Sequence, residues 1–217
     1  MRAYTPATHP EDQRALESAV ERALTRAAEH LATAPRFSPR PQNLAGTNIG
    51  FRGPEVLGED DGVMVVVRSL VEEGVPWEWL HLKLVANTWM FRPPHPAAPV
   101  DRKGGWNCDL AIVPPERLLT ATLPAASAHE FHFCALMEFK LQDDYWRAGG
   151  GNRPPTASFQ RAIQRDCDKL VRLLKAGVAP TAWACAFAYA DPLLPPEYIV
   201  QQQQRHEGLR VRLLRAW

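Results

Sequence analysis

The sequence has few cysteines, no long apolar run and no excess of charge of one sign. Its cysteines are few and far apart, with no C-x-x-C pair: Cys108, Cys134, Cys167 and Cys185. This spacing favours free thiols in a reducing cytoplasm over a zinc ribbon or a disulfide framework. No segment approaches the ~18 unbroken apolar residues of a membrane span, and the stretch MRAYTPATHPEDQRALESAV has no apolar signal core. We therefore expect a soluble, cytoplasmic protein with no membrane partner.

An excess of charge of one sign is also missing. The 25 basic and 24 acidic residues give a formal net charge of +1. This balance argues against a protein that grips naked nucleic acid along a long track, although it leaves room for a local basic patch. The length of 217 residues, with 46% hydrophobic and 23% charged residues, fits one globular domain with a core of its own. We predict a single domain over residues 1–217.

What is present is a series of helical and strand patterns separated by proline-rich and glycine-rich loops. In chain order they are a helix over residues 10–32, a strand or short buried helix over 62–74, a strand in the second half of 77–91, strands over 107–115 and 130–142, a helix over 157–177, a strand over 181–190, a short helix after Pro195 and a final strand over 209–217. This order predicts an α/β sandwich with a mixed central sheet flanked by helices.

The run CALMEFKLQ, residues 134–142, raises the main question, because an otherwise apolar strand carries two charges. Side chains alternate between the faces of a strand. One face is then uniformly apolar and is expected to pack under a helix: Phe131, Phe133, Ala135, Met137, Phe139 and Leu141. The other face becomes polar toward its end: His132, Cys134, Leu136, Glu138, Lys140 and Gln142. Burying a charge is costly unless it is paired or binds a metal, so this end is either a tolerated ion pair or part of a site.

The preceding strand carries a lone carboxylate, Asp109, in the apolar segment NCDLAIVPP. If the two strands are neighbours, Asp109 can converge with Glu138 and Lys140. Two carboxylates and an amine are the parts needed for metal-assisted phosphodiester hydrolysis, because Mg²⁺ prefers carboxylate and water oxygens and can activate a bound water. A lysine beside the metal can orient or deprotonate that water, or offset charge on phosphorus. The chain has only five lysines, so a lysine at this position is informative.

Asp109 on one strand, followed by Glu138-Phe139-Lys140 on the next, resembles the PD-(D/E)XK nuclease superfamily, which has the restriction-endonuclease-like fold. The following helix adds weight, since Asp166 precedes a Lys169-Leu170 pair as in the helix after the motif. The resemblance covers the first helix and roughly residues 83–190. It implies an αβββαβ sandwich with loop-rich insertions and a C-terminal extension. Cys108 stands where the name-giving motif has proline.

The resemblance also implies roles for individual residues. Asp109, Glu138 and the Phe139 carbonyl would bind Mg²⁺, with Mn²⁺ as an alternative ion, and Lys140 would serve the attacking water. A glutamate of the first helix often contributes in this superfamily, and Glu21 is our choice, with Glu17 as the alternative. Gln142 completes an E-x-K-x-Q pattern found in some branches. The expected catalytic residues are Asp109, Glu138, Lys140, Glu21 and Gln142.

Structural alternatives stand beside these roles. Glu138 and Lys140 could be a paired strand end, Asp109 could cap a turn, and Glu21 could be ordinary helix surface. We interpret Asp166 and Asp168 as helix surface, with contact to the site as the alternative.

Other motifs have weaker functional interpretations. A second acid-x-Lys triplet, Asp101 to Lys103, lies in a Pro/Gly-rich loop, and we interpret it as a match to the motif without a catalytic role. The HEFH sequence at residues 129–132 is one residue short of the zincin motif. Arg147 and Arg153 flank a glycine-rich loop without the ending of a P-loop, and could meet a nucleic-acid backbone. The tryptophans at 77, 79, 89 and 106 could stack bases or serve as packed core.

Three functions follow as expectations. The first is a metal-dependent endonuclease or exonuclease, with DNA favoured over RNA, acting as a homodimer or within a protein complex. The second is a catalytically silent member of the same fold that serves as a binding or assembly module. The third is a hydrolase of another phosphodiester or small molecule. A basic stripe beside the three residues would favour the first over the second, and a narrow closed pocket would favour the third.

Overall fold

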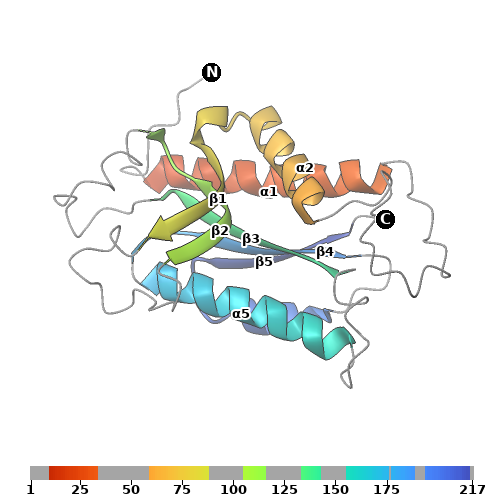
Figure 1. Cartoon of the computed structure of the whole chain (residues 1–217). Coiled ribbons are helices and arrows are strands. Elements are labelled where there is room, and N and C mark those ends of the chain that lie inside the picture. Colours follow the sequence, from red (N-terminus) through yellow and green to blue (C-terminus); the bar gives the residue numbers. More distant parts are fainter. Residues whose placement is uncertain are drawn as a thin grey trace.

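The computed structural model of the chain (Figure 1) describes residues 10–33, 59–87, 105–115, 133–142, 155–175, 177–188 and 194–215. Its elements, in chain order, are α1 (Pro10–Thr33), α2 (Glu59–Glu72), a 3-10 turn (Trp77–Trp79), β1 (Leu80–Asn87), β2 (Gly105–Ile112), β3 (Ala135–Leu141), α5 (Pro155–Lys175), β4 (Ala182–Ala188), α6 (Pro196–Gln203) and β5 (Leu209–Arg215).

The five strands form one mixed sheet in the order β1-β2-β3-β4-β5. The first three are antiparallel neighbours, while β3, β4 and β5 run parallel. Parallel neighbours need a crossover connection, and α5 lies in the crossover from β3 to β4. The sheet therefore changes from antiparallel to parallel pairing at β3, the strand that carries the charged run.

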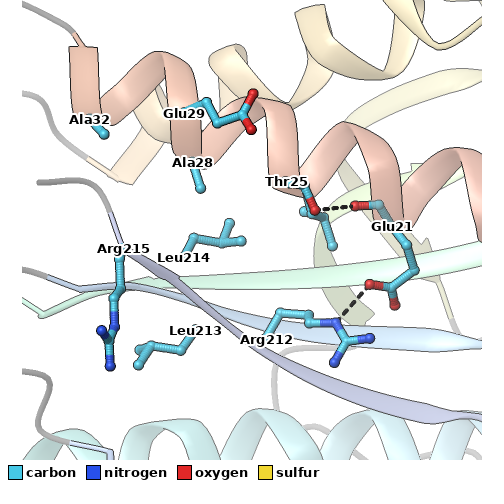
Figure 2. A pocket seen from close by; sticks show the side chains of 10 residues that line it. Glu21, Thr25, Ala28, Glu29, Ala32, Arg212, Leu213, Leu214 and Arg215 are labelled. Atoms are coloured by element: carbon cyan, nitrogen blue, oxygen red, sulfur yellow. Dashed lines mark hydrogen bonds and ion pairs between the residues drawn. The ribbon is translucent and has the colours of Figure 1, made fainter.

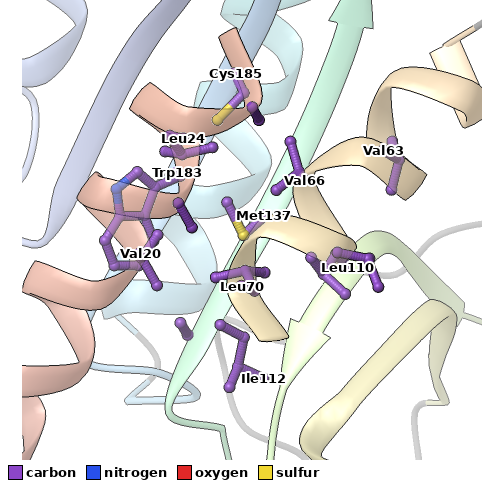
Figure 3. Packing of buried hydrophobic residues seen from close by; sticks show 14 of the residues in the cluster. Val20, Leu24, Val63, Val66, Leu70, Leu110, Ile112, Met137, Trp183 and Cys185 are labelled. Atoms are coloured by element: carbon purple, nitrogen blue, oxygen red, sulfur yellow. The ribbon is translucent and has the colours of Figure 1, made fainter. Parts of the chain in front are cut away.

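Helices cover both faces of the sheet. Figure 1 shows α1 and α2 on one face and α5 on the other, and Tyr198 and Ile199 of α6 pack with the α5 side. In Figure 3, Val20 and Leu24 of α1 and Val66 and Leu70 of α2 meet Met137 of β3. These contacts bury the apolar stripe of each helix, which is the main source of helix stability in proteins.

The α2 segment resolves an ambiguity of the sequence. Residues 62–74 read as a strand or a short helix, and they form a helix. Its valines and leucine that face the sheet recur at helical spacing and are buried: Val63, Val66, Val67 and Leu70. Gly62 allows close packing, because a Cβ there would come within 2.7 Å of the Phe187 ring.

The predicted alternation along β3 is confirmed within the strand. Ala135, Met137, Phe139 and Leu141 belong to the core on the α1 side, and Leu136 belongs to the core on the α5 side. The prediction is wrong for Phe133 and Cys134, which pack on the faces opposite to those expected. The strand begins only at Ala135, so the two residues before it do not follow strand alternation.

The architecture confirms the coarse prediction of a mixed α/β fold with a central sheet flanked by helices. None of the helices that the structure describes combines the length and hydrophobicity needed to cross a lipid bilayer.

Candidate active site at the opening between β2 and β3

The candidate site lies where β2 separates from β3. The pairing of these strands extends over three positions, from Ile112 opposite Ala135 to Leu110 opposite Met137. Beyond it, the main-chain N–H of Phe139 donates to Asp109 Oδ2 at 2.8 Å. A side-chain carboxylate thus takes the place of a main-chain acceptor, and this fixes Asp109, which is 8% exposed, against the edge of β3.

Glu59, in the first turn of α2, makes the equivalent contact one step further along. Its Oε2 accepts a hydrogen bond from the N–H of Leu141 at 3.3 Å. Asp109 and Glu59 therefore both lie along the edge of β3 that β2 leaves. The two carboxylates accept hydrogen bonds from main-chain N–H groups of β3 that would otherwise lack acceptors.

Lys140 lies among these carboxylates. Its Nζ donates to the Phe139 carbonyl at 2.6 Å and lies 3.3 Å from Asp166 Oδ2, 3.8 Å from Glu59 Oε2 and 4.0 Å from Asp109 Oδ2. Burial alone would lower the pKa of Lys140, but the surrounding carboxylates outweigh it and raise the pKa above its usual range. Lys140 is therefore held as an ammonium.

Glu138 lies on the same strand and pairs with Lys169 of α5. Glu138 is 3% exposed. Burial raises the pKa of its carboxyl group, with Asp109 and Asp166 adding to the rise and Lys169 opposing it. Burial also raises the pKa of Asp166, against the lowering effect of Lys140 and Lys169. Burial is thus the main cause of both rises, and neighbouring carboxylates add to it.

The structure thus brings Asp109, Glu138 and Lys140 into one cluster, to which α2 adds Glu59 and α5 adds Asp166 and Lys169. Gln142 follows at the end of β3 and is buried. Of the two aspartates interpreted as helix surface, Asp166 pairs with Lys140 whereas Asp168 pairs with Arg205.

Glu21 does not join this cluster, contrary to our expectation. Its carboxylate accepts hydrogen bonds from Trp183 Nε1 at 2.9 Å and from Arg212 Nε at 2.7 Å. Trp183 belongs to the core between the sheet and α1, so Glu21 lies on the face of the sheet opposite α5. The alternative, Glu17, lies 3.8 Å from Arg210 of β5.

An open pocket of about 410 Å³ lies between α1 and β5, and Figure 2 shows Glu21 and Arg212 on its wall. Its lining includes none of Asp109, Glu138 and Lys140. The charged pair in it is internally satisfied, so the pocket is a gap beside the edge strand and contributes no group to the cluster.

The donor chemistry of the cluster fits a hard divalent cation, since it offers carboxylates from neighbouring strands and a main-chain carbonyl. Each expected ligand is nevertheless engaged by the protein: Asp109 by the Phe139 N–H, the Phe139 carbonyl by Lys140 and Glu138 by Lys169. In keeping with this, no three His, Cys, Asp or Glu side chains in the described part of the chain are arranged to hold a metal ion.

Two cluster members were missed as site residues by sequence reasoning. Glu59 falls just before the ambiguous 62–74 segment, and its only signal is the acidic first turn of a helix, Glu59 to Asp61. Lys169 has a usable signal, because Asp166 and Lys169 are three residues apart and share one face of α5. The Asp101–Lys103 triplet, the HEFH sequence, Arg147, Arg153 and Trp89 lie outside the described residues.

Comparisons of the chain with protein-family models, with curated proteins and with solved structures found no match.

Proposed function

We propose that this protein is a metal-dependent nuclease of the PD-(D/E)XK superfamily that hydrolyses phosphodiester bonds, with DNA favoured over RNA. The observation that carries the proposal is the position of Asp109, Glu138 and Lys140 at the opening between β2 and β3. The order of elements supports it as well: α1, the antiparallel strands β1 to β3, the crossover helix α5 and the parallel strand β4 follow the order that the resemblance implies, with α2 as an addition after α1 and α6 and β5 as additions after β4.

In this proposal Asp109, Glu138 and the Phe139 carbonyl would hold Mg²⁺ or Mn²⁺, which when bound would supply an activated water and polarise the scissile phosphate. Lys140 lies beside these ligands, where it would orient or deprotonate the attacking water, or offset negative charge on the phosphate. Asp109 also supports the site, because it fixes the main chain at Phe139.

A second candidate is a catalytically silent binding or assembly module of the same fold. One observation favours it: lysines and a main-chain N–H engage all three expected ligands. A retired site stabilised by its own ion pairs would have this arrangement. The near-neutral net charge is also compatible with such a module.

Cleavage assays separate the two candidates. Supercoiled plasmid, linear duplex, single-stranded DNA and RNA are incubated with Mg²⁺, Mn²⁺ or EDTA, and with wild type, Asp109→Asn and Lys140→Met. We expect metal-dependent cleavage that each substitution lowers at least about 100-fold, because each removes a charge that acts in the transition state.

Two features of the design keep the assay interpretable. Asp109→Asn retains a side-chain oxygen that can accept the Phe139 N–H, so a loss of activity will not simply report unfolding. Lys175→Met removes an exposed lysine of α5 and should cleave like wild type. Absence of cleavage on all four substrates, with a folded protein, would favour the binding module.

A further inference from the structure

Two ion pairs cross between β3 and α5. Lys140 of β3 lies 3.3 Å from Asp166 of α5, and Lys169 of α5 pairs with Glu138 of β3. Each element thus supplies a cation to the carboxylate of the other. The Lys140 side chain is 20% exposed and the Lys169 side chain 23%, whereas the Glu138 side chain is 4% exposed.

The Lys169 contact has a direct physical cause. A buried carboxylate without a cationic partner is strongly unfavourable, and Glu138 lies close enough to Asp109 and Asp166 for both to raise its pKa. The Lys169 ammonium compensates this charge. Its long stem reaches Glu138 from α5 and leaves the head group partly in contact with solvent.

We infer that Lys169 is a positioning residue that holds Glu138 in the metal-free protein and must release it when a divalent cation binds. Lys169 then sets the metal affinity of the site, while Lys140 serves the reaction. The inference rests on the proposed metal-dependent function, but it concerns binding rather than turnover. It also accounts for expected ligands that are close together yet not arranged as a metal site.

The partial exposure of the Lys169 side chain gives its ammonium a route away from Glu138. An ammonium on a flexible four-carbon stem that is partly exposed can move into water, where it is strongly hydrated. Lys140 instead donates to the Phe139 carbonyl and lies within 4.0 Å of Asp166, Glu59 and Asp109. The two lysines of the cluster therefore have different roles.

Calorimetric titration of the full chain with Mn²⁺ tests the inference without any assay of cleavage. Wild type is compared with Lys169→Gln and with the matched control Lys175→Gln, which removes the same charge from an exposed position of α5. At a pH at which Glu138 is ionised in both proteins, we expect Lys169→Gln to bind Mn²⁺ about tenfold more tightly, since the cation no longer competes with the ammonium. Lys175→Gln should stay within about twofold of wild type. Equal or weaker binding by Lys169→Gln would overturn the inference.

Thermal unfolding gives a second readout. In EDTA the midpoint of Lys169→Gln should lie below that of wild type, because Glu138 has lost its partner, and saturating Mn²⁺ should remove most of the difference. Lys169→Arg keeps the charge and should resemble wild type in both tests. If Lys169→Gln does not fold, the double variant Glu138→Gln/Lys169→Gln removes both charges; it should fold in EDTA and bind Mn²⁺ at least about tenfold more weakly than wild type.

The outcomes separate this inference from the nuclease proposal. Tighter Mn²⁺ binding by Lys169→Gln without any cleavage by wild type would support the inference and contradict the nuclease. Cleavage by wild type with unchanged Mn²⁺ affinity in Lys169→Gln would support the nuclease and overturn the inference. Absence of Mn²⁺ binding by both proteins would overturn both.

Discussion

Lys140 shows how neighbouring residues decide what a side chain can do. A lysine buried alone would lose its proton more readily, and one exposed lysine would have no defined position. Here carboxylates from β2, α2 and α5 lie within 4.0 Å of Nζ and keep the group charged. The ammonium is thereby fixed beside the Phe139 carbonyl and Asp109, two of the ligands that the motif implies.

Glu21 allows a residue-level test of what belongs to the site. Its carboxylate satisfies the indole N–H of Trp183, which is fully buried, and pairs with Arg212. Glu21→Ala leaves a buried donor without its acceptor, so we expect unfolding to become easier by about 1–3 kcal/mol. Cleavage per folded molecule should stay within about twofold of wild type, because a group without contact to the reacting atoms does not change the barrier.

For purified Glu21→Ala, urea unfolding measures the free energy of unfolding, and the plasmid assay measures cleavage per folded molecule. Glu21→Gln serves as a control, since its amide oxygen can still accept the indole N–H. A large loss of cleavage with unchanged stability would return Glu21 to the active site.

The sequence allowed the strand residues of the cluster to be predicted better than the helix residues. Asp109, Glu138 and Lys140 lie on strands, where alternation alone assigns a face once the neighbours are known. The first helix carries acids on several faces, and only its packing on the sheet decides which of them faces the sheet. Glu21 was therefore a choice among similar candidates, and the only signal for Glu59 was the acidic first turn of a helix.

At the scale of elements, the same reasoning explains which predictions held. Long periodic segments such as α1 and α5 were predicted as helices because their apolar stripes repeat several times. The 62–74 segment was ambiguous because a run of valines is compatible with a strand and with a buried helix. The segment is helical because it packs against α1 and β3. These contacts cannot be read from the sequence of the segment alone.

The attachment of α6 to α5 gives a pH prediction. The Tyr198 hydroxyl donates to the Gln160 carbonyl at 2.6 Å, and burial raises the pKa of Tyr198 from 10.0 to about 12. Below pH 10 the tyrosine is protonated in both the folded and the unfolded chain. Between pH 10 and 12 the unfolded chain loses this proton first, so it binds fewer protons and the free energy of unfolding falls as the pH rises.

Tyr198→Phe removes both the hydrogen bond and the titrating group. At pH 8 we expect it to lower the free energy of unfolding by about 1 kcal/mol. As the pH rises above 10, the difference from wild type should shrink, because only wild type loses stability through this group. Urea unfolding at pH 8, 9, 10 and 11 measures the difference directly. A difference that is constant across this range would show that Tyr198 titrates alike in both states.

At the scale of the whole molecule, the candidate site depends on both faces of the sheet. Glu59 comes from a helix on the α1 side, Asp166 and Lys169 come from the helix on the opposite side, and β2 and β3 lie between them. The same strand, β3, contributes Met137 to one core and Leu136 to the other. Loss of either core should therefore disturb the other core and the site together.

This dependence predicts one cooperative unfolding transition, which also tests the assignment of residues 1–217 to a single domain. Met137→Ala opens a cavity in the α1-side core and Leu170→Ala opens one in the α5-side core. Both side chains are fully buried, so each change should lower the free energy of unfolding by about 2–5 kcal/mol. Because the two side chains lie in separate cores, the effects should add within about 0.5 kcal/mol.

Urea unfolding followed by tryptophan fluorescence and by far-UV circular dichroism provides the measurement. Trp79 and Trp183, two of the seven tryptophans, lie in the α1-side core, whereas circular dichroism reports the helices of both sides. In a single transition the two signals coincide for wild type and for both variants. If Leu170→Ala shifted the circular dichroism while the fluorescence transition stayed in place, the two cores would unfold separately. The cluster between β3 and α5 would then open while the α1 layer remained folded, and metal binding would be lost before the sheet itself unfolds.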